Sequence, residues 1–212
     1  MNNFKNTALI LACNKGYTSI VQALIKANAN INIKNAIHDT ALIRACDRGF
    51  ENIVNLLLEQ KADVNVLNKK NDTALTLACF NGHSKIAQIL LDHGANPNVK
   101  DKNDNTPLMM ASFNGYQSIV EMLLKIEKEK IELDNKNTDG NTALMMACFN
   151  EHESIVKLLL EKGVNVNIES KQGETALSIA KYKKNYAIID LLIHHGATNN
   201  ESDNNSDDSF EE

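Results

Sequence analysis

The chain has 212 residues, of which 43% are apolar, few are aromatic and none is tryptophan, and its formal net charge at pH 7 is −5. The segment from Asn199 onward holds six acidic residues and no basic one, so the rest of the chain is nearly neutral and gives no support to nucleic-acid binding. No apolar stretch approaches the roughly 20 residues that cross a membrane, and the N-terminus lacks the apolar run of a signal peptide. We therefore expect an intracellular, cytoplasmic protein that binds neither nucleic acid nor membrane.

A threonine followed by Ala or Pro and then Leu recurs along almost the whole chain. The six threonines are Thr7, Thr40, Thr73, Thr106, Thr142 and Thr175. Their spacings are 33, 33, 33, 36 and 33 residues. A period this constant predicts stacked copies of one supersecondary unit. We therefore expect one elongated domain over residues 1–198, with repeats 1 to 6 beginning near residues 6, 39, 72, 105, 141 and 174.

Repeat 3 illustrates the expected elements. Thr73 can cap a short first helix, and Gly82 supplies the left-handed residue that ends it. Apolar residues from Ile86 to Leu91 recur at the spacing of a second helix, which ends near Gly94. Neither helix can bury its apolar face alone. The sequence thus predicts an all-α repeat solenoid of helix-turn-helix units with projecting β-hairpin or loop fingers.

These motifs resemble the ankyrin-repeat family. The family's opening phrase appears as Thr106-Pro107-Leu108-Met109, its Gly-His turn as Gly82-His83, and its ending as the segment Leu90 to Asn98. The resemblance covers residues 6 to 198 in six copies. It implies a non-enzymatic module without cofactors that binds a protein on a concave face. The family's His after Leu is absent from every copy, and the hydrogen bond between repeats that it would make is lost. The residues in its place are Ile10, Ile43, Thr76, Met109, Met145 and Ser178.

Two segments depart from the period. Three extra residues follow Leu124, and the pair Lys125–Glu129 at i,i+4 spacing favours a solvated helix extension; a local docking knob is the alternative. Repeat 6 carries Lys181 where inner repeats have Cys or Ser, followed by further polar residues, which predicts a capping repeat.

Four cysteines, Cys13, Cys46, Cys79 and Cys148, each lie six residues after their threonine. Stacked helices lie roughly 8–10 Å apart, whereas a disulfide needs Cα atoms within about 7 Å. We expect all four to be buried, reduced packing residues. Cys79–His83 and Cys148–His152 have a spacing that two metal ligands on a helix can use. We nevertheless expect no metal and no catalytic residue, because each Cys faces the core and no third group orients the His.

An aromatic ladder follows the cysteine register: Phe80, Phe113, Phe149 and Tyr182. The resemblance places these residues on the concave, partner-binding side, beside Asn81, Asn114 and Asn150, with Asp47 and Arg48 at the corresponding places in repeat 2. Exposed aromatic residues are typical anchors of interfaces. The alternative is that each phenylalanine packs sideways on its neighbour and only stiffens the stack.

Lys69, Lys102 and Lys171 repeat at the expected finger tips, as solvated side chains or as an electrostatic guide for acidic partners. Asn32, Asn65, Asn98 and Asn167 occupy the family's hairpin asparagine, whose side chain we expect to bond local backbone. In the family this asparagine can also be hydroxylated.

The acidic segment 199–212 is too polar to fold and is predicted to be a disordered tail, with Ser209 in a weak acidophilic kinase pattern. For the whole chain we expect a monomer that binds a protein partner. The alternative is an inhibitor or adaptor that recruits a client to a larger complex, acting on host proteins if the gene is viral or from a parasite.

Overall fold

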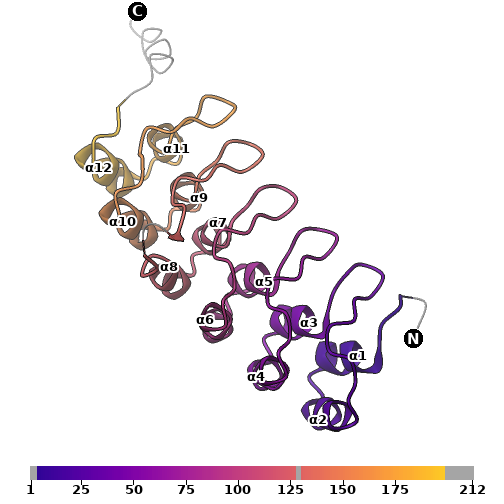
Figure 1. Cartoon of the computed structure of the whole chain (residues 1–212). Coiled ribbons are helices and arrows are strands. Elements are labelled where there is room, and N and C mark those ends of the chain that lie inside the picture. Colours follow the sequence, from indigo (N-terminus) through magenta and orange to yellow (C-terminus); the bar gives the residue numbers. More distant parts are fainter. Residues whose placement is uncertain (1–3, 128–129, 199–212) are drawn as a thin grey trace, which may run out of the picture.

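The computed structural model describes residues 4–127 and 130–198, which form a curved stack of helix pairs (Figure 1). The helices, in pairs, are α1 Ala8–Lys15 and α2 Thr18–Lys26; α3 Ala41–Arg48 and α4 Glu51–Glu59; α5 Ala74–Phe80 and α6 Ser84–Asp92; α7 Pro107–Phe113 and α8 Gln117–Leu123; α9 Ala143–Phe149 and α10 Glu153–Glu161; α11 Ala176–Tyr182 and α12 Tyr186–His194. The first helices of the pairs form one row, the second helices form another, and the connecting loops project beyond the first row. The all-α solenoid is confirmed. The described residues contain no strand, so the fingers are loops rather than β-hairpins.

Each first helix begins one residue after a threonine of the repeated phrase. The Thr73 hydroxyl accepts a hydrogen bond from the Thr76 N–H at 3.2 Å, and the Thr73 N–H donates to the Thr76 hydroxyl at 2.8 Å. Thr175 and Ser178 form the same reciprocal pair. Such caps stabilise a helix by about 1 kcal/mol each. Thr76 and Ser178, which stand in place of the family's His, therefore stabilise the N-termini of α5 and α11.

The cysteine prediction is confirmed. Cys13, Cys46, Cys79 and Cys148 are all free and fully buried in one continuous core. Burial raises the pKa of the Cys13 and Cys148 thiols to about 12, so the thiols are neutral at physiological pH. Repeat 4 carries Ser112 at this register, and its buried hydroxyl has no hydrogen-bond partner.

The turn between paired helices contacts a ring of the following repeat. Gly82 has φ +76°, and a Cβ added there would lie 2.6 Å from the Tyr116 ring. Gly49 meets His83 in the same way, at 2.6 Å. Only glycine combines the left-handed backbone with the close approach of the ring. His83 thus has a packing role between repeats.

The predicted helix extension after Leu124 is wrong, because α8 ends at Leu123. The chain turns there instead, as the Lys125 N–H donates to the Met122 carbonyl and the Ile126 N–H to the Leu123 carbonyl. Ile126 packs against the core, which favours the turn over a solvated helix. Glu129 lies outside the described residues, and so do the tail 199–212 and Ser209.

The last repeat has the features expected of a cap. Lys181 is exposed at the register where the inner repeats bury Cys or Ser. On α12 only Ile188 and Leu192 are buried, whereas α10 buries four residues. A second helix with a narrow apolar face is a feature of capping repeats in solenoids.

Candidate functional site

A groove of about 610 Å³ runs along repeats 3 to 6 between the first helices and the projecting loops; we call it the finger groove. Its floor is apolar and comes from α5, α7, α9 and α11. The apolar lining residues are Leu77, Phe80, Met110, Phe113, Met145, Met146, Phe149 and Ile179. Its wall is polar and comes from the loops. The charged wall residues are Lys70, Asp72, Asp101, Lys102, Asp139 and Glu174.

Three of the four ladder aromatics meet in this groove. Phe80, Phe113 and Phe149 line the floor and are 49%, 44% and 48% exposed. Among the described residues, no ring contact joins these phenylalanines, which argues against the sideways stacking that we considered. The Lys183 ammonium lies 4.1 Å from the centroid of the Phe149 ring and covers one face of it. Tyr182 is 82% exposed and does not line the groove.

A second apolar row lies beside the aromatics and was missed in the sequence. Leu77, Met110, Met146 and Ile179 each precede a ladder aromatic by three residues. Residues three apart share one face of a helix, so the period and this spacing together could have identified the row. The two rows make the floor continuous from one repeat to the next.

The predicted asparagines Asn81, Asn114 and Asn150 all form hydrogen bonds within the chain. The Asn81 side-chain amide donates to the Leu77 carbonyl at 3.0 Å and to the Asp47 carbonyl at 3.3 Å. The Asn150 amide donates to the Phe113 carbonyl at 2.9 Å, which belongs to the preceding repeat. Only Asn114 of the three lines the finger groove. Asn81 and Asn150 therefore tie successive first helices together.

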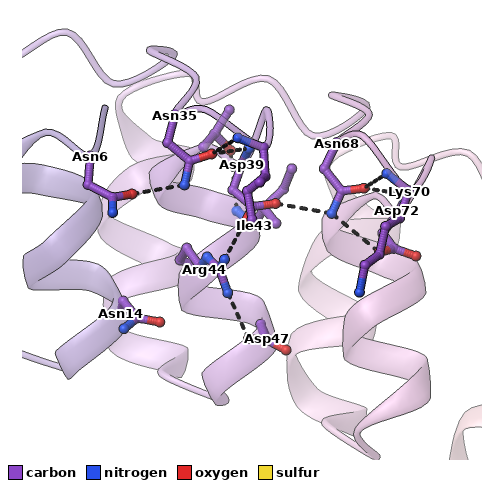
Figure 2. Close-up of polar contacts among 12 residues, drawn as sticks. Asn6, Asn14, Asn35, Asp39, Ile43, Arg44, Asp47, Asn68, Lys70 and Asp72 are labelled. Carbon is purple, nitrogen blue, oxygen red and sulfur yellow. Dashed lines mark hydrogen bonds and ion pairs between the residues drawn. The ribbon is translucent and has the colours of Figure 1, made fainter. Parts of the chain in front are cut away.

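In repeat 2 the corresponding face carries a polar network, which Asn14 of repeat 1 joins (Figure 2). Arg44 places one guanidinium nitrogen 2.6 Å from the Asp39 carboxylate and another 3.5 Å from that of Asp47. Arg48 lies 3.7 Å from Asp47 and donates to the Asn14 side chain at 3.2 Å. Asp47 and Arg48 are thus brought together as predicted, but in an internal network that does not line the finger groove.

Each finger is a five-residue loop closed by its first side chain. In the loop 68–72, the Asn68 side-chain oxygen accepts from the Lys70 N–H at 2.8 Å and from the Asp72 N–H at 2.9 Å. The equivalent first residues are Asn35, Asn68, Asp101, Asn137 and Ser170. Polar side chains that bond nearby backbone stabilise turns. Their period was present in the sequence but went unrecognised, because loop residues carry no helical pattern.

The same first residues also link neighbouring fingers, but not everywhere. The Asn35 amide donates to the Asn6 side chain at 2.8 Å, and the Asn68 amide to the Asp39 carboxylate at 3.0 Å (Figure 2). The Asn137 amide donates to the Asn105 side chain at 3.0 Å. A carboxylate cannot donate, so Asp101 makes no such bond to the preceding finger.

The fingers 68–72 and 101–105 therefore lack such a side-chain link, and the Asp101 carboxylate accepts the amide of Asn105 in its own loop at 3.2 Å instead. Burial raises the pKa of the Asp72 carboxyl above its ordinary value, and the charges of Asp101 and Asp39 raise it further. The hydrogen bond from Asn68 and the charge of Lys70 act in the opposite direction. At the next break in the series, Ser170 is too short to donate to Asn141, whose side-chain oxygen has no partner.

The three predicted finger-tip lysines are all exposed and share one register. Their backbone N–H groups donate to the preceding finger, for example from Lys69 to the Ile37 carbonyl at 3.0 Å and from Lys171 to the Asp139 carbonyl at 2.8 Å. Of the three, only Lys102 lines the finger groove.

The expectation that the hairpin asparagines bond local backbone is wrong. The Asn98 amide donates to the Lys130 carbonyl at 2.8 Å, and its oxygen accepts from the Glu132 N–H at 3.0 Å. Asn65 and Asn167 reach the following repeat in the same way, and Asn32 accepts from the Asp63 N–H. The extended segment lies against its equivalent in the next repeat, so the nearest free backbone groups are about 30 residues away in sequence.

Within residues 4–127 and 130–198, no cluster of three or more His, Cys, Asp or Glu side chains is placed to hold a metal ion. None of the described helices is long and apolar enough to pass through a bilayer.

Two comparisons relate the chain to known proteins. The sequence model of the family described as "Ankyrin repeats (3 copies)" matches residues 1–68, 60–135 and 128–203. The crystal structure of the human ASB11 ankyrin repeat domain superposes with a TM-score of 0.81 at 27% identity, covering 91% of this chain and 85% of that one. No curated protein sequence matches the chain.

Proposed function

The chain belongs to the ankyrin-repeat family, and from this premise we propose that the finger groove binds a segment of a protein partner. The ankyrin fold generally serves as a protein–protein interaction module, and its members are typically not enzymes. The observation that carries the proposal is the exposure of Phe80 and Phe113 in a continuous apolar floor. Large aromatic side chains left half exposed in a groove are the usual anchors of an interface.

The remaining predicted positions contribute less under this proposal. Phe149 is partly covered by Lys183, and Tyr182 stands outside the groove. Asp47, Arg48, Asn81 and Asn150 are engaged in contacts within the solenoid. Affinity should therefore concentrate at the two central phenylalanines rather than along the whole ladder.

The test is quantitative affinity capture with the full chain and with its Phe80→Ala/Phe113→Ala variant. Truncating one anchor should weaken binding roughly 5- to 150-fold, which corresponds to about 1–3 kcal/mol. Tyr186→Ala is the matched control, because Tyr186 is an exposed aromatic on α12 outside the groove. Thermal melts establish that each variant is folded. Undiminished capture by the folded double variant would place the binding surface elsewhere.

A further inference from the structure

We propose that the partner segment carries an arginine whose guanidinium lies between Asp72 and Asp101, with large apolar side chains on either side that pack on Phe80 and Phe113. This inference rests on the proposed function of the finger groove. It adds the chemistry of the partner, which the fold alone does not specify.

The first step is that repeat 2 already holds a guanidinium at the equivalent place. Arg44 on α3 reaches the finger and pairs with Asp39, whose side chain is only 3% exposed, at 2.6 Å. Asp39 immediately precedes the threonine cap of α3, as Asp72 precedes that of α5. The backbone at this register therefore accommodates a guanidinium between finger and helix (Figure 2).

The second step is that repeat 3 has the carboxylate but not the guanidinium. Leu77 stands at the register of Arg44, and Phe80 stands at that of Asp47. Asp72 accepts one side-chain hydrogen bond, from the Asn68 amide at 3.3 Å. In the described part of the chain, neither Asp72 nor Asp101 forms an ion pair. Lys70 and Lys102 also line the groove, and the charge of Lys70 lowers the pKa of Asp72, but neither lysine forms an ion pair with Asp72 or Asp101. A guanidinium placed as Arg44 is in repeat 2 therefore has to come from outside the chain.

The third step is that Asp101 adds a second carboxylate to the same place. At the other fingers with an asparagine, an amide donates across to the preceding finger. Here the two carboxylates both line the groove beside Leu77 and Phe80. Asp101 accepts the Asn105 side-chain amide at 3.2 Å within its own finger and has no side-chain donor from the preceding one. The raised pKa of Asp72 has the charge of Asp101 among its causes. A group with several N–H donors inserted between them would relieve the repulsion.

Arginine fits this place better than lysine. Its planar guanidinium donates two parallel hydrogen bonds to carboxylates and stacks on aromatic rings, and it is less strongly hydrated than an ammonium group. The apolar floor lowers the local dielectric constant and so strengthens such a pair. A second copy of this chain is a poor source, because its only two arginines, Arg44 and Arg48, are already paired with aspartates.

The experiment selects a displayed library of random linear peptides on the full chain, on the Asp72→Asn/Asp101→Asn variant and on Asp104→Asn. The two substitutions copy asparagines that neighbouring repeats carry at the same registers, so the fold is retained. Asp104 is an exposed carboxylate of the same finger that does not line the groove, so it controls for loss of charge. Wild type and control should enrich peptides with an arginine between bulky apolar residues.

On the double variant, the same peptides should bind roughly tenfold or more weakly. Leu77→Arg, which copies Arg44 into repeat 3, should also weaken their binding, because its own guanidinium would occupy the place of the peptide's arginine. Enriched peptides that need Phe80 and Phe113 but lack arginine, or that bind the double variant equally well, would overturn this inference and leave the proposed function standing. No groove-dependent peptide on wild type would overturn both.

Discussion

Repeat 2 and repeats 3 to 5 present the same helix register to the fingers but carry different side chains there. In repeat 2, the residues at this register are Arg44 and Asp47, which satisfy each other and Asp39. In repeats 3 to 5 they are apolar, and the groove between helices and fingers is open. The backbone is the same in these repeats. The residues at the two positions equivalent to Arg44 and Asp47 therefore decide whether a repeat pairs its own polar groups or offers an apolar surface to a partner.

Repeat 2 and repeats 3 to 5 can be compared in this way only if they share one hydrophobic core. The largest expected loss of stability tests whether they do. Cys46→Asp and Cys79→Asp should each cost several kcal/mol, because each places an unpaired charge at a fully buried position. Cys46→Ala and Cys79→Ala are the matched controls and should cost far less. Urea melts measure all four. An aspartate variant as stable as its alanine control would show that the core differs between the regions.

Arg44→Leu removes the guanidinium and so gives repeat 2 the character of repeat 3. It should cost about 2–4 kcal/mol, since Asp39 is left buried with too few partners. Arg48→Leu is the control, because Arg48 is 52% exposed and its pairing is peripheral. Adding Asp39→Asn to Arg44→Leu should restore much of the loss in thermal unfolding. Equal costs for the two arginine variants would mean that Asp39 does not depend on Arg44.

Ser112→Cys restores in repeat 4 the residue of the other inner repeats. It should stabilise the chain by about 1 kcal/mol, because the buried hydroxyl has no partner. Denaturant melts at matched conditions detect the change, with Ser118→Cys on the exposed surface as control. A loss of stability would indicate that the Ser112 hydroxyl is satisfied in solution.

Asp72→Asn should give the smallest effect, a rise in melting temperature on the order of 1 °C at neutral pH. The folded-state pKa of Asp72 is raised above the ordinary value of 3.8, so the folded protein binds the proton more tightly than the unfolded chain. Stability of the wild type therefore falls as pH rises through this window, and the substitution removes that loss. The gain should vanish as the pH falls below 3.8. A gain that persists at low pH would rule out the carboxylate as its source.

The structural roles that recur in every repeat could be predicted from the sequence, because each role is marked by one residue type at one position of the repeat. Threonine caps, buried cysteines and exposed phenylalanines recur at a fixed offset, and every copy strengthens the interpretation. The extent of the groove could not be predicted, because it depends on which repeats follow. Tyr182 shares the register of Phe80, but it is 82% exposed and does not line the groove.

Contacts between repeats could not be predicted from the sequence. The Asn98 side chain bonds backbone beyond position 129, and the Asp72–Asp101 pair joins two different fingers. Neither follows from local turn preferences, since both depend on how successive loops are stacked. The helix extension failed for a related reason: the Lys125–Glu129 spacing carries no information on the burial of Ile126.

The uneven links between fingers have a mechanical consequence. Neighbouring fingers all share a backbone hydrogen bond, but the side-chain link is missing between loops 68–72 and 101–105 and again between 137–141 and 170–174. A linear stack under tension yields where adjacent units are joined most weakly. When the solenoid is stretched from its two ends, neighbouring repeats should separate first at those two boundaries. One of them lies between Phe80 and Phe113, so the groove floor spans a boundary that extends easily.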